Sequence, residues 1–372
     1  MPGAQNLEIF DALADGGLRN VLVASELGAA FMADGYARAS GQTGVCLAIP
    51  GPGLTNMITG LAEALVDSSP LLVLVTAVER DDKAFHLHEI DQMQTVAPVV
   101  KGVFTPADAR EIPARVEEAF CLAESGEPGP VVVELGRELL RKRFDPGSIL
   151  PSKTISPELI DPNKLDRIAG LLRGARRLGI YAGKGALGAS AEIAQLAELL
   201  AAPVATTISG KGAIPEDHPL SAGFGFGPSG TRAAAESFAR CDVVLALGCK
   251  FAEMSTSKWL MPIKGKLIHV DQSPEVLDRN YPAEVVLRAD TGEALRAILS
   301  RLGSDPARDP TFARETISRA RQKELQRIER IAAQEGVHPS RLLHRLRERL
   351  ERDAVVTTDC GSHQLWAVLD WQ

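Results

Sequence analysis

Short apolar runs alternate with helical patterns along most of the 372-residue chain. In the first part, apolar runs predict strands at Asn20–Ala24, Gly44–Ile49, Leu71–Thr76 and Val131–Leu135. Apolar positions at helical spacing predict helices at Glu26–Ser40, Thr55–Val66 and Ile112–Glu124. Apolar strands that alternate with helices are typical of parallel sheets covered by helices.

The same alternation returns further along the chain. Strands are predicted at Leu178–Tyr181, Pro203–Thr207, Val243–Leu247 and Lys266–Val270, and helices at Ala191–Leu200 and Gly230–Arg240. Between the two parts, a charged stretch at 137–145 is followed by prolines at 146, 151 and 157, which indicates a linker.

The last part of the chain has a different pattern. The stretch Asp309–Leu350 is rich in Arg, Glu and Gln and predicts two helices, the first solvated and linking. Residues Ala354–Trp366 predict a strand, a glycine turn and the start of a helix. We expect an α/β protein with two doubly wound parallel-sheet domains and the start of a third, which is incomplete at residue 372.

Composition excludes several classes of function. With 45% hydrophobic and 24% charged residues, the chain is typical of a soluble globular protein. The net charge of −7 argues against a nucleic-acid-binding surface. The sequence opens with no signal-peptide pattern and has no apolar run of about 18 residues, so we expect a cytoplasmic protein without a membrane span. The five cysteines are scattered, with no CxxC pair and no metal-ligand spacing.

Glu26 is the first candidate for chemistry. It opens a predicted helix in which Gly28, Ala30 and Ala33 leave little side-chain bulk on one face. We expect this carboxyl to be buried among apolar groups, which disfavours its charged form and suits it to exchange protons near neutrality. The alternative interpretation is a solvated carboxylate that interacts with the helix dipole.

A glycine turn with the sequence G-P-G-L-T-N occupies positions 51–56, between a predicted strand and a helix. Glycine lets the backbone of such a turn approach a ligand closely, because no Cβ intervenes. The alternative is a plain strand-to-helix turn.

These two motifs belong to a longer ordered pattern. Glu26 is followed by G-A-A, A-D-G-Y-A-R, G-V-C-L and the glycine turn, and then by a helix that ends near D-S-S-P before an apolar strand. The pattern resembles the thiamine diphosphate-dependent 2-keto acid enzymes of the acetolactate synthase large-subunit type. The resemblance covers nearly the whole chain in the family's order.

The resemblance implies a domain organisation. We expect a pyrimidine-binding domain at 1–145 without its N-terminal strand, a linker at 146–158, a central Rossmann-like domain at 159–305, a helical linker at 306–335 and an incomplete diphosphate-binding domain at 336–372. It also implies decarboxylation of a 2-keto acid, with pyruvate as the expected substrate, and carboligation to a second carbonyl. We expect the isolated chain to be inactive.

The resemblance also implies roles for individual residues. In the family, the glutamate that matches Glu26 hydrogen-bonds the aminopyrimidine ring of the cofactor and so controls a proton at its reactive carbon. The expected cofactor-binding residues are Pro50, Gly51, Gly53 and Asn56 at the pyrimidine and Gly361, His363 and Gln364 at the diphosphate. The family's Gly-Asp-Gly metal motif has no match, so we expect the Mg²⁺ ligands beyond residue 372 and none within this chain.

Residues 85–92 resemble the family's substrate-facing loop and make His88 and Gln92 further catalytic candidates. His86 and His88 could shuttle protons or bind a substrate carboxylate, or they could be ordinary surface histidines. Leu87-His88-Glu89 stands where acetolactate-forming members usually have Phe-Gln-Glu, and Ser25 stands where they usually have His. Because of these departures, the resemblance does not identify the particular substrate.

In the central domain, the family holds FAD, ADP or no nucleotide. The candidate nucleotide-binding residues here are Gly183, Gly185, Gly248, Lys250 and Asp271. The first two belong to a GxGxxG turn, which can also serve only tight packing, and the lack of an acid after the next strand argues against a nicotinamide site. Lys250 stands where the family has arginine, and Asp271 could meet a ribose or cap the next helix.

The resemblance implies an assembly, because the family binds its cofactor between two subunits. We therefore expect a homodimer or tetramer that acts on a small-molecule 2-keto acid. Two alternatives stay open: a non-catalytic nucleotide-binding or partner subunit, and another thiamine diphosphate-dependent lyase or decarboxylase.

Overall fold

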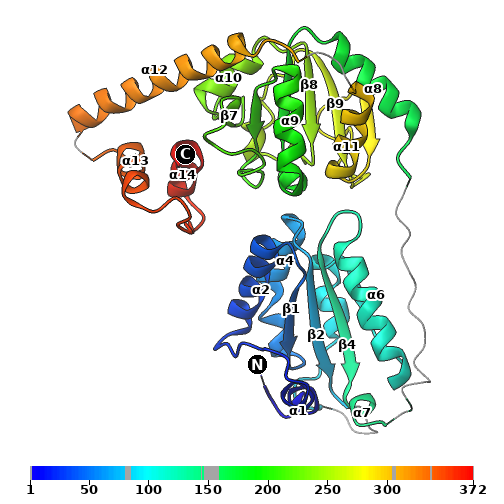
Figure 1. Cartoon of the computed structure of the whole chain (residues 1–372). Helices are drawn as coiled ribbons and strands as arrows, with labels where there is room; N and C mark the ends of the chain where they lie inside the picture. Colours follow the sequence, from blue (N-terminus) through cyan, green and yellow to red (C-terminus); the bar gives the residue numbers. More distant parts are fainter. Residues whose placement is uncertain are drawn as a thin grey trace. The chain divides into compact units, whose positions relative to one another are not determined.

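The computed structural model describes residues 2–79, 85–143, 145, 159–303, 307–335 and 337–371. The chain folds into two compact units, Met1–Pro157 and Glu158–Gln372 (Figure 1). Each unit has one parallel sheet with helices on both faces, which confirms the predicted α/β class. The five domain and linker boundaries stay predictions, and the linker predicted at 146–158 lies entirely outside the described residues.

The first unit contains a four-stranded parallel sheet in the order β1-β2-β4-β3. Its strands are β1 (Gly44–Ala48), β2 (Leu71–Ala77), β3 (Gly102–Phe104) and β4 (Pro130–Gly136). Its α-helices are α1 (Leu7–Asp15), α2 (Glu26–Ser40), α3 (Pro52–Thr55), α4 (Ile58–Val66), α5 (Gln92–Val96), α6 (Ile112–Glu124) and α7 (Arg137–Leu140).

Both faces of this sheet are buried, because successive side chains of a strand point to opposite sides. Val73 of β2 packs with the small-residue face of α2 and with α4, whereas Leu72 packs on the other side with α6. Figure 1 shows these helices on opposite sides of the sheet. This double cover explains why the strands are continuously apolar.

Several predictions for the first unit were wrong in detail. Asn20–Ala24 forms no strand, and Val21 and Leu22 are 63% and 69% exposed. A strand exists only where its backbone pairs with a neighbour, and among the described residues β1 pairs with β2 alone. The helix predicted at Thr55–Val66 begins only at Ile58, as α4, and the separate short helix α3 precedes it.

The second unit contains a six-stranded parallel sheet in the order β10-β9-β8-β5-β6-β7. Its strands are β5 (Leu178–Ala182), β6 (Val204–Thr206), β7 (Ser221–Phe224), β8 (Val243–Leu247), β9 (Lys266–Asp271) and β10 (Val285–Arg288). Its α-helices are α8 (Pro162–Gly174), α9 (Ser190–Leu200), α10 (Arg232–Phe238), α11 (Thr291–Leu302), α12 (Thr311–Glu335), α13 (Pro339–Arg349) and α14 (Ser362–Asp370).

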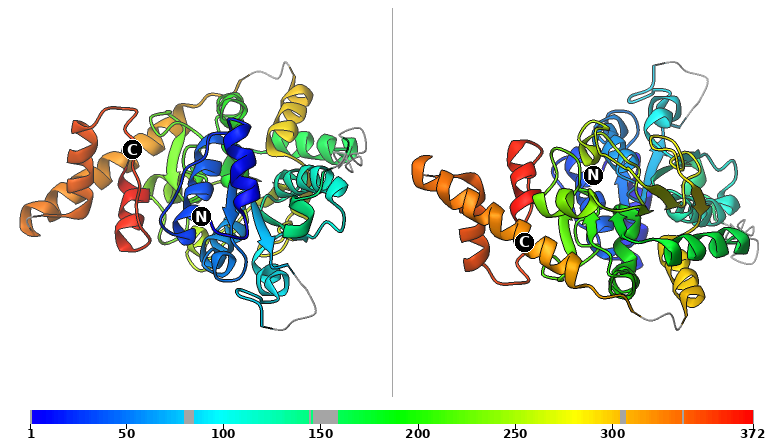
Figure 2. Two further views of the ribbon diagram at one scale, coloured as in Figure 1. Left: turned by 90° about the horizontal axis from the view of Figure 1, so that it is seen from below. Right: turned by 90° about the horizontal axis from the view of Figure 1, so that it is seen from above.

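One face of this sheet is covered by α8, α9 and α11, and the other by α10 and by Ile317 and Ala320 of α12. The prediction that α12 is solvated and linking was therefore wrong for its first half. Ala313, Ile317 and Ala320 are buried at helical spacing, a pattern that the surrounding Arg and Glu residues obscure. Figure 2 shows the remainder of α12 projecting beyond the sheet of this unit, with α13 and α14 beside it.

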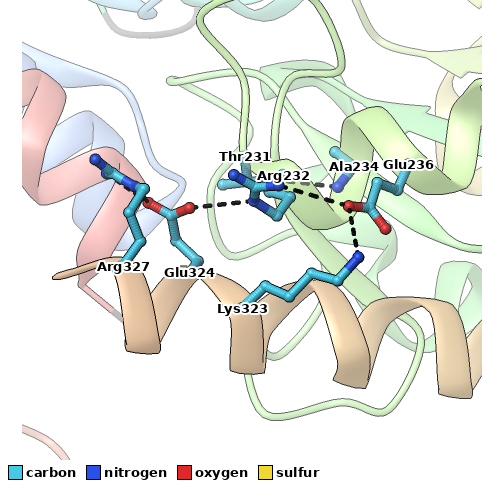
Figure 3. Close-up of polar contacts among 7 residues, drawn as sticks. All are labelled: Thr231, Arg232, Ala234, Glu236, Lys323, Glu324 and Arg327. Atoms are coloured by element: carbon cyan, nitrogen blue, oxygen red, sulfur yellow. Dashed lines mark hydrogen bonds and ion pairs between the residues drawn. The ribbon is translucent and has the colours of Figure 1, made fainter. Parts of the chain in front are cut away.

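Ion pairs reinforce the contact between α10 and α12 (Figure 3). Glu324 of α12 lies 3.3 Å from Nε of Arg232 and 2.6 Å from Nη2 of Arg327. Lys323 lies 3.8 Å from Glu236 of α10. Charged residues of α12 thus face solvent along the helix and also bind it to α10.

The strand predicted at the start of Ala354–Trp366 was also wrong. Residues 354–358 form neither helix nor strand, and Val355 is 92% exposed. The predicted helix start is present as α14. None of the helices in the described part of the chain is long and apolar enough to cross a membrane.

Candidate functional site

The catalytic candidates of the first unit gather where its parallel strands end. The glycine turn follows β1, Thr76 lies at the end of β2, and Glu134 lies near the end of β4. The carboxyl ends of parallel strands share one edge of the sheet, which is where α/β proteins bind ligands. The structure thereby brings Glu26, Gly51 and Gln92 into one hydrogen-bonded region.

Glu26 begins α2, and its Oε2 accepts a hydrogen bond from Nδ2 of Asn56 over 3.3 Å. The prediction of a buried carboxyl was wrong for this chain by itself, because Glu26 is only partly buried. The small residues do pack as expected, since Ala30 and Ala33 are buried, but they lie deeper along the helix than Glu26. The carboxylate is therefore oriented and still accessible.

The glycines of the turn are required by packing within the protein. Gly51 has φ of +64°, and a Cβ there would lie 2.5 Å from the carbonyl oxygen of His88. A Cβ on Gly53 would lie 2.7 Å from Ile49. Pro50 is buried beside them. The turn is thus packed tightly against the segment that contains His88.

Gln92 is the first residue of α5, and its side chain points into the protein. Its Oε1 accepts from the backbone N–H of Gly51, and its Nε2 donates to the carbonyl of Thr76 and to Oε1 of Glu134. The sequence resemblance led us to expect Gln92 to face a substrate, whereas the structure gives its whole amide group to protein partners. Glu134 was missed, because nothing in its local sequence distinguishes it from other strand residues.

The two histidines differ in their surroundings. His88 has φ of +69° and is partly buried, and its Nδ1 is buried without a hydrogen-bond partner in the protein. The backbone N–H of His86 donates to Oε2 of Glu89 over 3.2 Å. Burying a ring nitrogen without a hydrogen-bond partner costs folding free energy. The Nδ1 atom of His88 is therefore available to hydrogen-bond a ligand.

In the second unit, the GxGxxG turn after β5 crosses the loop after β8. The N–H of Gly185 donates to the carbonyl of Gly248 over 3.2 Å, and a Cβ on Gly183 would lie 2.1 Å from the same oxygen. Gly248 has φ of +55°, and its own Cβ would lie 2.5 Å from Gly185. These glycines permit two backbones to touch, which is the packing interpretation of the motif.

The other two central-domain candidates lie at the same strand edge. Lys250 is partly buried two residues beyond Gly248. Asp271 ends β9, and its Oδ1 accepts from the N–H of Ser273 over 2.9 Å. The Asp271 side chain therefore caps the following turn, and it has a local structural role whether or not a ribose binds there.

Gly361, His363 and Gln364 lie at the start of α14. Gly361 has φ of +150°, which favours glycine, and the helix begins at Ser362. Because the first backbone N–H groups of a helix have no partners within it, they can bind an anion such as a diphosphate. His363 is exposed beside them. Among the described residues, no group of three or more His, Cys, Asp or Glu could hold a metal ion.

Comparison with known families bears on this arrangement. Residues 1–95 match the N-terminal TPP binding domain of thiamine pyrophosphate (thiamine diphosphate) enzymes, and residues 165–298 match the central domain of the same enzymes. The chain belongs to the thiamine pyrophosphate enzyme family. The resemblance seen in the sequence is thereby confirmed.

Relatives within the thiamine pyrophosphate enzyme family align with nearly all of the chain. A probable acetolactate synthase large subunit of Methanocaldococcus jannaschii is 34% identical over 98% of the chain and 64% of the relative. The isozyme 2 large subunit of Escherichia coli acetolactate synthase is 33% identical, over 98% and 66%. A probable 2-ketoarginine decarboxylase of Pseudomonas aeruginosa is 35% identical, over 96% and 64%. The chain thus spans a little under two thirds of the length of these relatives.

Proposed function

We propose that this chain forms part of a thiamine diphosphate-dependent enzyme that decarboxylates a 2-keto acid, with pyruvate as the expected substrate, and joins the product to a second carbonyl. The observation that supports the proposal most directly is the pair formed by Glu26 and Asn56 beside the glycine turn. The acetolactate synthase relatives support the carboligation step.

The residues of the site fit the pyrimidine end of the cofactor. A partly open carboxylate that is held by an amide can accept a hydrogen bond from a nitrogen heterocycle and carry its proton. Thiamine diphosphate supplies the carbanion chemistry when it is bound. Glu26 would hold and return one proton, Asn56 would orient its carboxylate, and the turn at Gly51 would keep both in place.

The other end of the cofactor has candidate ligands as well. Gly361 and His363 at the start of α14 would bind the diphosphate through backbone N–H groups and a ring N–H of the histidine. Mg²⁺ would then need oxygen ligands from outside the 372 residues, as the resemblance implies.

The test uses the full-length protein with thiamine diphosphate, Mg²⁺ and pyruvate. We expect release of carbon dioxide together with acetolactate, and loss of both in Glu26→Gln, whose amide cannot carry the proton. Glu63→Gln changes an exposed carboxylate on α4 and is the matched control. Turnover by Glu26→Gln at the wild-type rate would remove Glu26 from the mechanism.

A decarboxylase without carboligation is the second candidate. The 2-ketoarginine decarboxylase relative favours it, as does the replacement of the usual Phe-Gln-Glu by Leu87-His88-Glu89. The same assay separates the two, because a simple decarboxylase releases carbon dioxide and an aldehyde without acetolactate.

A non-catalytic nucleotide-binding subunit is the third candidate, and the central unit is where it would bind. Titration calorimetry with FAD and with ADP tests the nucleotide binding on this chain, and the absence of turnover in the pyruvate assay tests whether the subunit is non-catalytic. Binding that is lost in Lys250→Ala would support a nucleotide site at the β8 edge. The contacts among Gly183, Gly185 and Gly248 already account for the glycine motif without a ligand.

An exposed apolar face supports a dimeric assembly. Leu27, Phe31, Met32 and Tyr36 of α2 are all exposed, next to Glu26. Several large apolar side chains exposed on one helix often mark an interface. A homodimer that buries α2 would also shield the carboxylate of Glu26 from water.

A further inference from the structure

Gln92 holds together the segments that form the candidate site. Its side chain is buried, with 4% exposed. It accepts from Gly51 N–H over 3.1 Å, donates to the carbonyl of Thr76 over 3.0 Å and donates to Oε1 of Glu134 over 2.7 Å. The three partners come from the turn after β1, the end of β2 and the end of β4.

This arrangement engages both polar atoms of the Gln92 side chain. The other oxygen of Glu134 accepts from the hydroxyl of Thr105 over 3.4 Å, so the carboxylate is held as well. The carbonyl of His88 occupies the space beside Gly51 from the same loop. The Gln92 amide itself is buried and fully paired, and a buried group that is paired in this way is held rigidly.

Gly51 connects this network to the proposed chemistry. Gly51 is the N-cap of the four-residue helix α3, and Asn56 is its C-cap. Asn56 in turn donates to Glu26. One helical turn therefore separates the residue that Gln92 holds from the residue that orients the carboxylate.

We propose that Gln92 is a positioning residue, which sets the turn at Gly51 and through it the approach of Asn56 to Glu26, and that it does not contact the substrate. The inference rests on the proposed function for its catalytic consequence. Its structural part, the fixing of the turn, is independent of any activity.

Gln92→Glu tests the structural part with an unchanged carbon skeleton. One oxygen can still accept from Gly51, but the other then faces the carbonyl of Thr76 and the carboxylate of Glu134, which are both acceptors. A proton shared between the two carboxyls restores one hydrogen bond, so the damage grows as pH rises. We expect amide hydrogen exchange at 51–57, relative to wild type, to increase about tenfold at pH 8 and much less at pH 5.

Two further variants complete this test. Gln94→Glu introduces the same charge on an exposed position of α5 and should leave exchange at 51–57 unchanged. Gln92→Glu combined with Glu134→Gln returns a donor to the pair and should recover part of the protection. Wild-type protection in Gln92→Glu at pH 8 would overturn the proposal.

Activity of the full-length protein tests the catalytic part. We expect Gln92→Glu to raise the concentration of thiamine diphosphate for half-maximal activity about tenfold, with KM for the keto acid unchanged. An altered KM for the keto acid at saturating cofactor would instead indicate substrate contact and overturn the positioning role. If the wild type is inactive, the proposed function fails, while the exchange data still decide whether Gln92 fixes the turn.

Discussion

The side-chain amide of Asn56 donates a hydrogen bond to Glu26, although 30 positions separate the two residues. The contact joins the end of the short helix after β1 to the start of α2. It fixes one oxygen of a carboxylate that is otherwise partly open to solvent. The geometry predicts that Asn56 controls how Glu26 gains and loses its proton.

Asn56→Asp should lower kcat/KM of the full-length enzyme at least about tenfold. The change removes the donor and places a second negative charge beside Glu26. Because like charges disfavour ionisation, the acidic limb of the pH–rate profile should move to higher pH. Thr59→Asp, on an exposed position of α4, is the control. An unchanged profile in Asn56→Asp would show that the contact has no part in proton transfer.

Gly51→Ala should destabilise the first unit by about 1–3 kcal/mol, because Gly51 has positive φ and its Cβ would meet the carbonyl of His88. Gly170→Ala is the contrasting change, since Gly170 is exposed within α8 and its Cβ would meet nothing within 4 Å. It should stabilise by about 0.5–1 kcal/mol. Urea unfolding followed by circular dichroism measures both. Equal effects of the two substitutions would refute the packing argument.

The ion pairs in Figure 3 predict a dependence of α12 docking on pH. Burial alone would raise the pKa of Glu324, but hydrogen bonds and charges of Arg327 and Arg232 outweigh it and hold the pKa below its ordinary value of 4.5. A lowered pKa gives stability that is present above the ordinary value and is lost as pH falls through the folded-state value.

We therefore expect amide exchange in the first half of α12 to increase as pH falls below 4.5, after correction for intrinsic rates. Glu324→Gln should remove this contribution and cost about 1 kcal/mol or less at neutral pH, because the pairs are near the surface. Added salt should have a similar effect in the wild type. If amide exchange in α12 depends on pH in Glu324→Gln as it does in the wild type, titratable groups other than Glu324 cause that dependence.

Phe31→Glu should dissociate the proposed dimer, because it places a charge in the middle of the exposed apolar face of α2. Light scattering after size-exclusion chromatography gives the mass directly. Val66→Glu places the same charge on an exposed residue at the end of α4 and should leave the mass unchanged. Equal masses for wild type and Phe31→Glu would exclude this face as the interface.

The sequence predicted those long elements whose ends carry strong local signals, whereas the helices α8 (Pro162–Gly174) and α11 (Thr291–Leu302) were missed. Both bounds of α2 agree with the prediction, since Gly41 in the left-handed region ends the helix. β3, β7 and β10 were missed, because runs of three or four residues such as Gly102–Phe104 differ little from loops. Asn20–Ala24 was wrong for the opposite reason: its residues suit a strand, but pairing depends on a neighbour that no local pattern reveals.

The candidate site was only partly predictable for the same physical reason. Glu26 and Asn56 belong to recognisable motifs, and the structure brings them together. The contact of Gln92 with Glu134 joins residues 42 positions apart and exists only because β2 and β4 are neighbours. The direction of a polar side chain decides whether it contacts a ligand or other residues of the protein. That direction depends on the tertiary structure and has no local signal in the sequence.

The crossing of Gly183, Gly185 and Gly248 bears on how the polypeptide matures during synthesis. The bend that follows β5 receives its contact only after some sixty more amino acids have been translated, when β8 and its loop emerge from the ribosome. A nascent chain stalled before that point has the bend exposed. We therefore expect the second unit to become protease-resistant only after β8 has been synthesised, and a bulky substitution at Gly183 or Gly248 to delay that step.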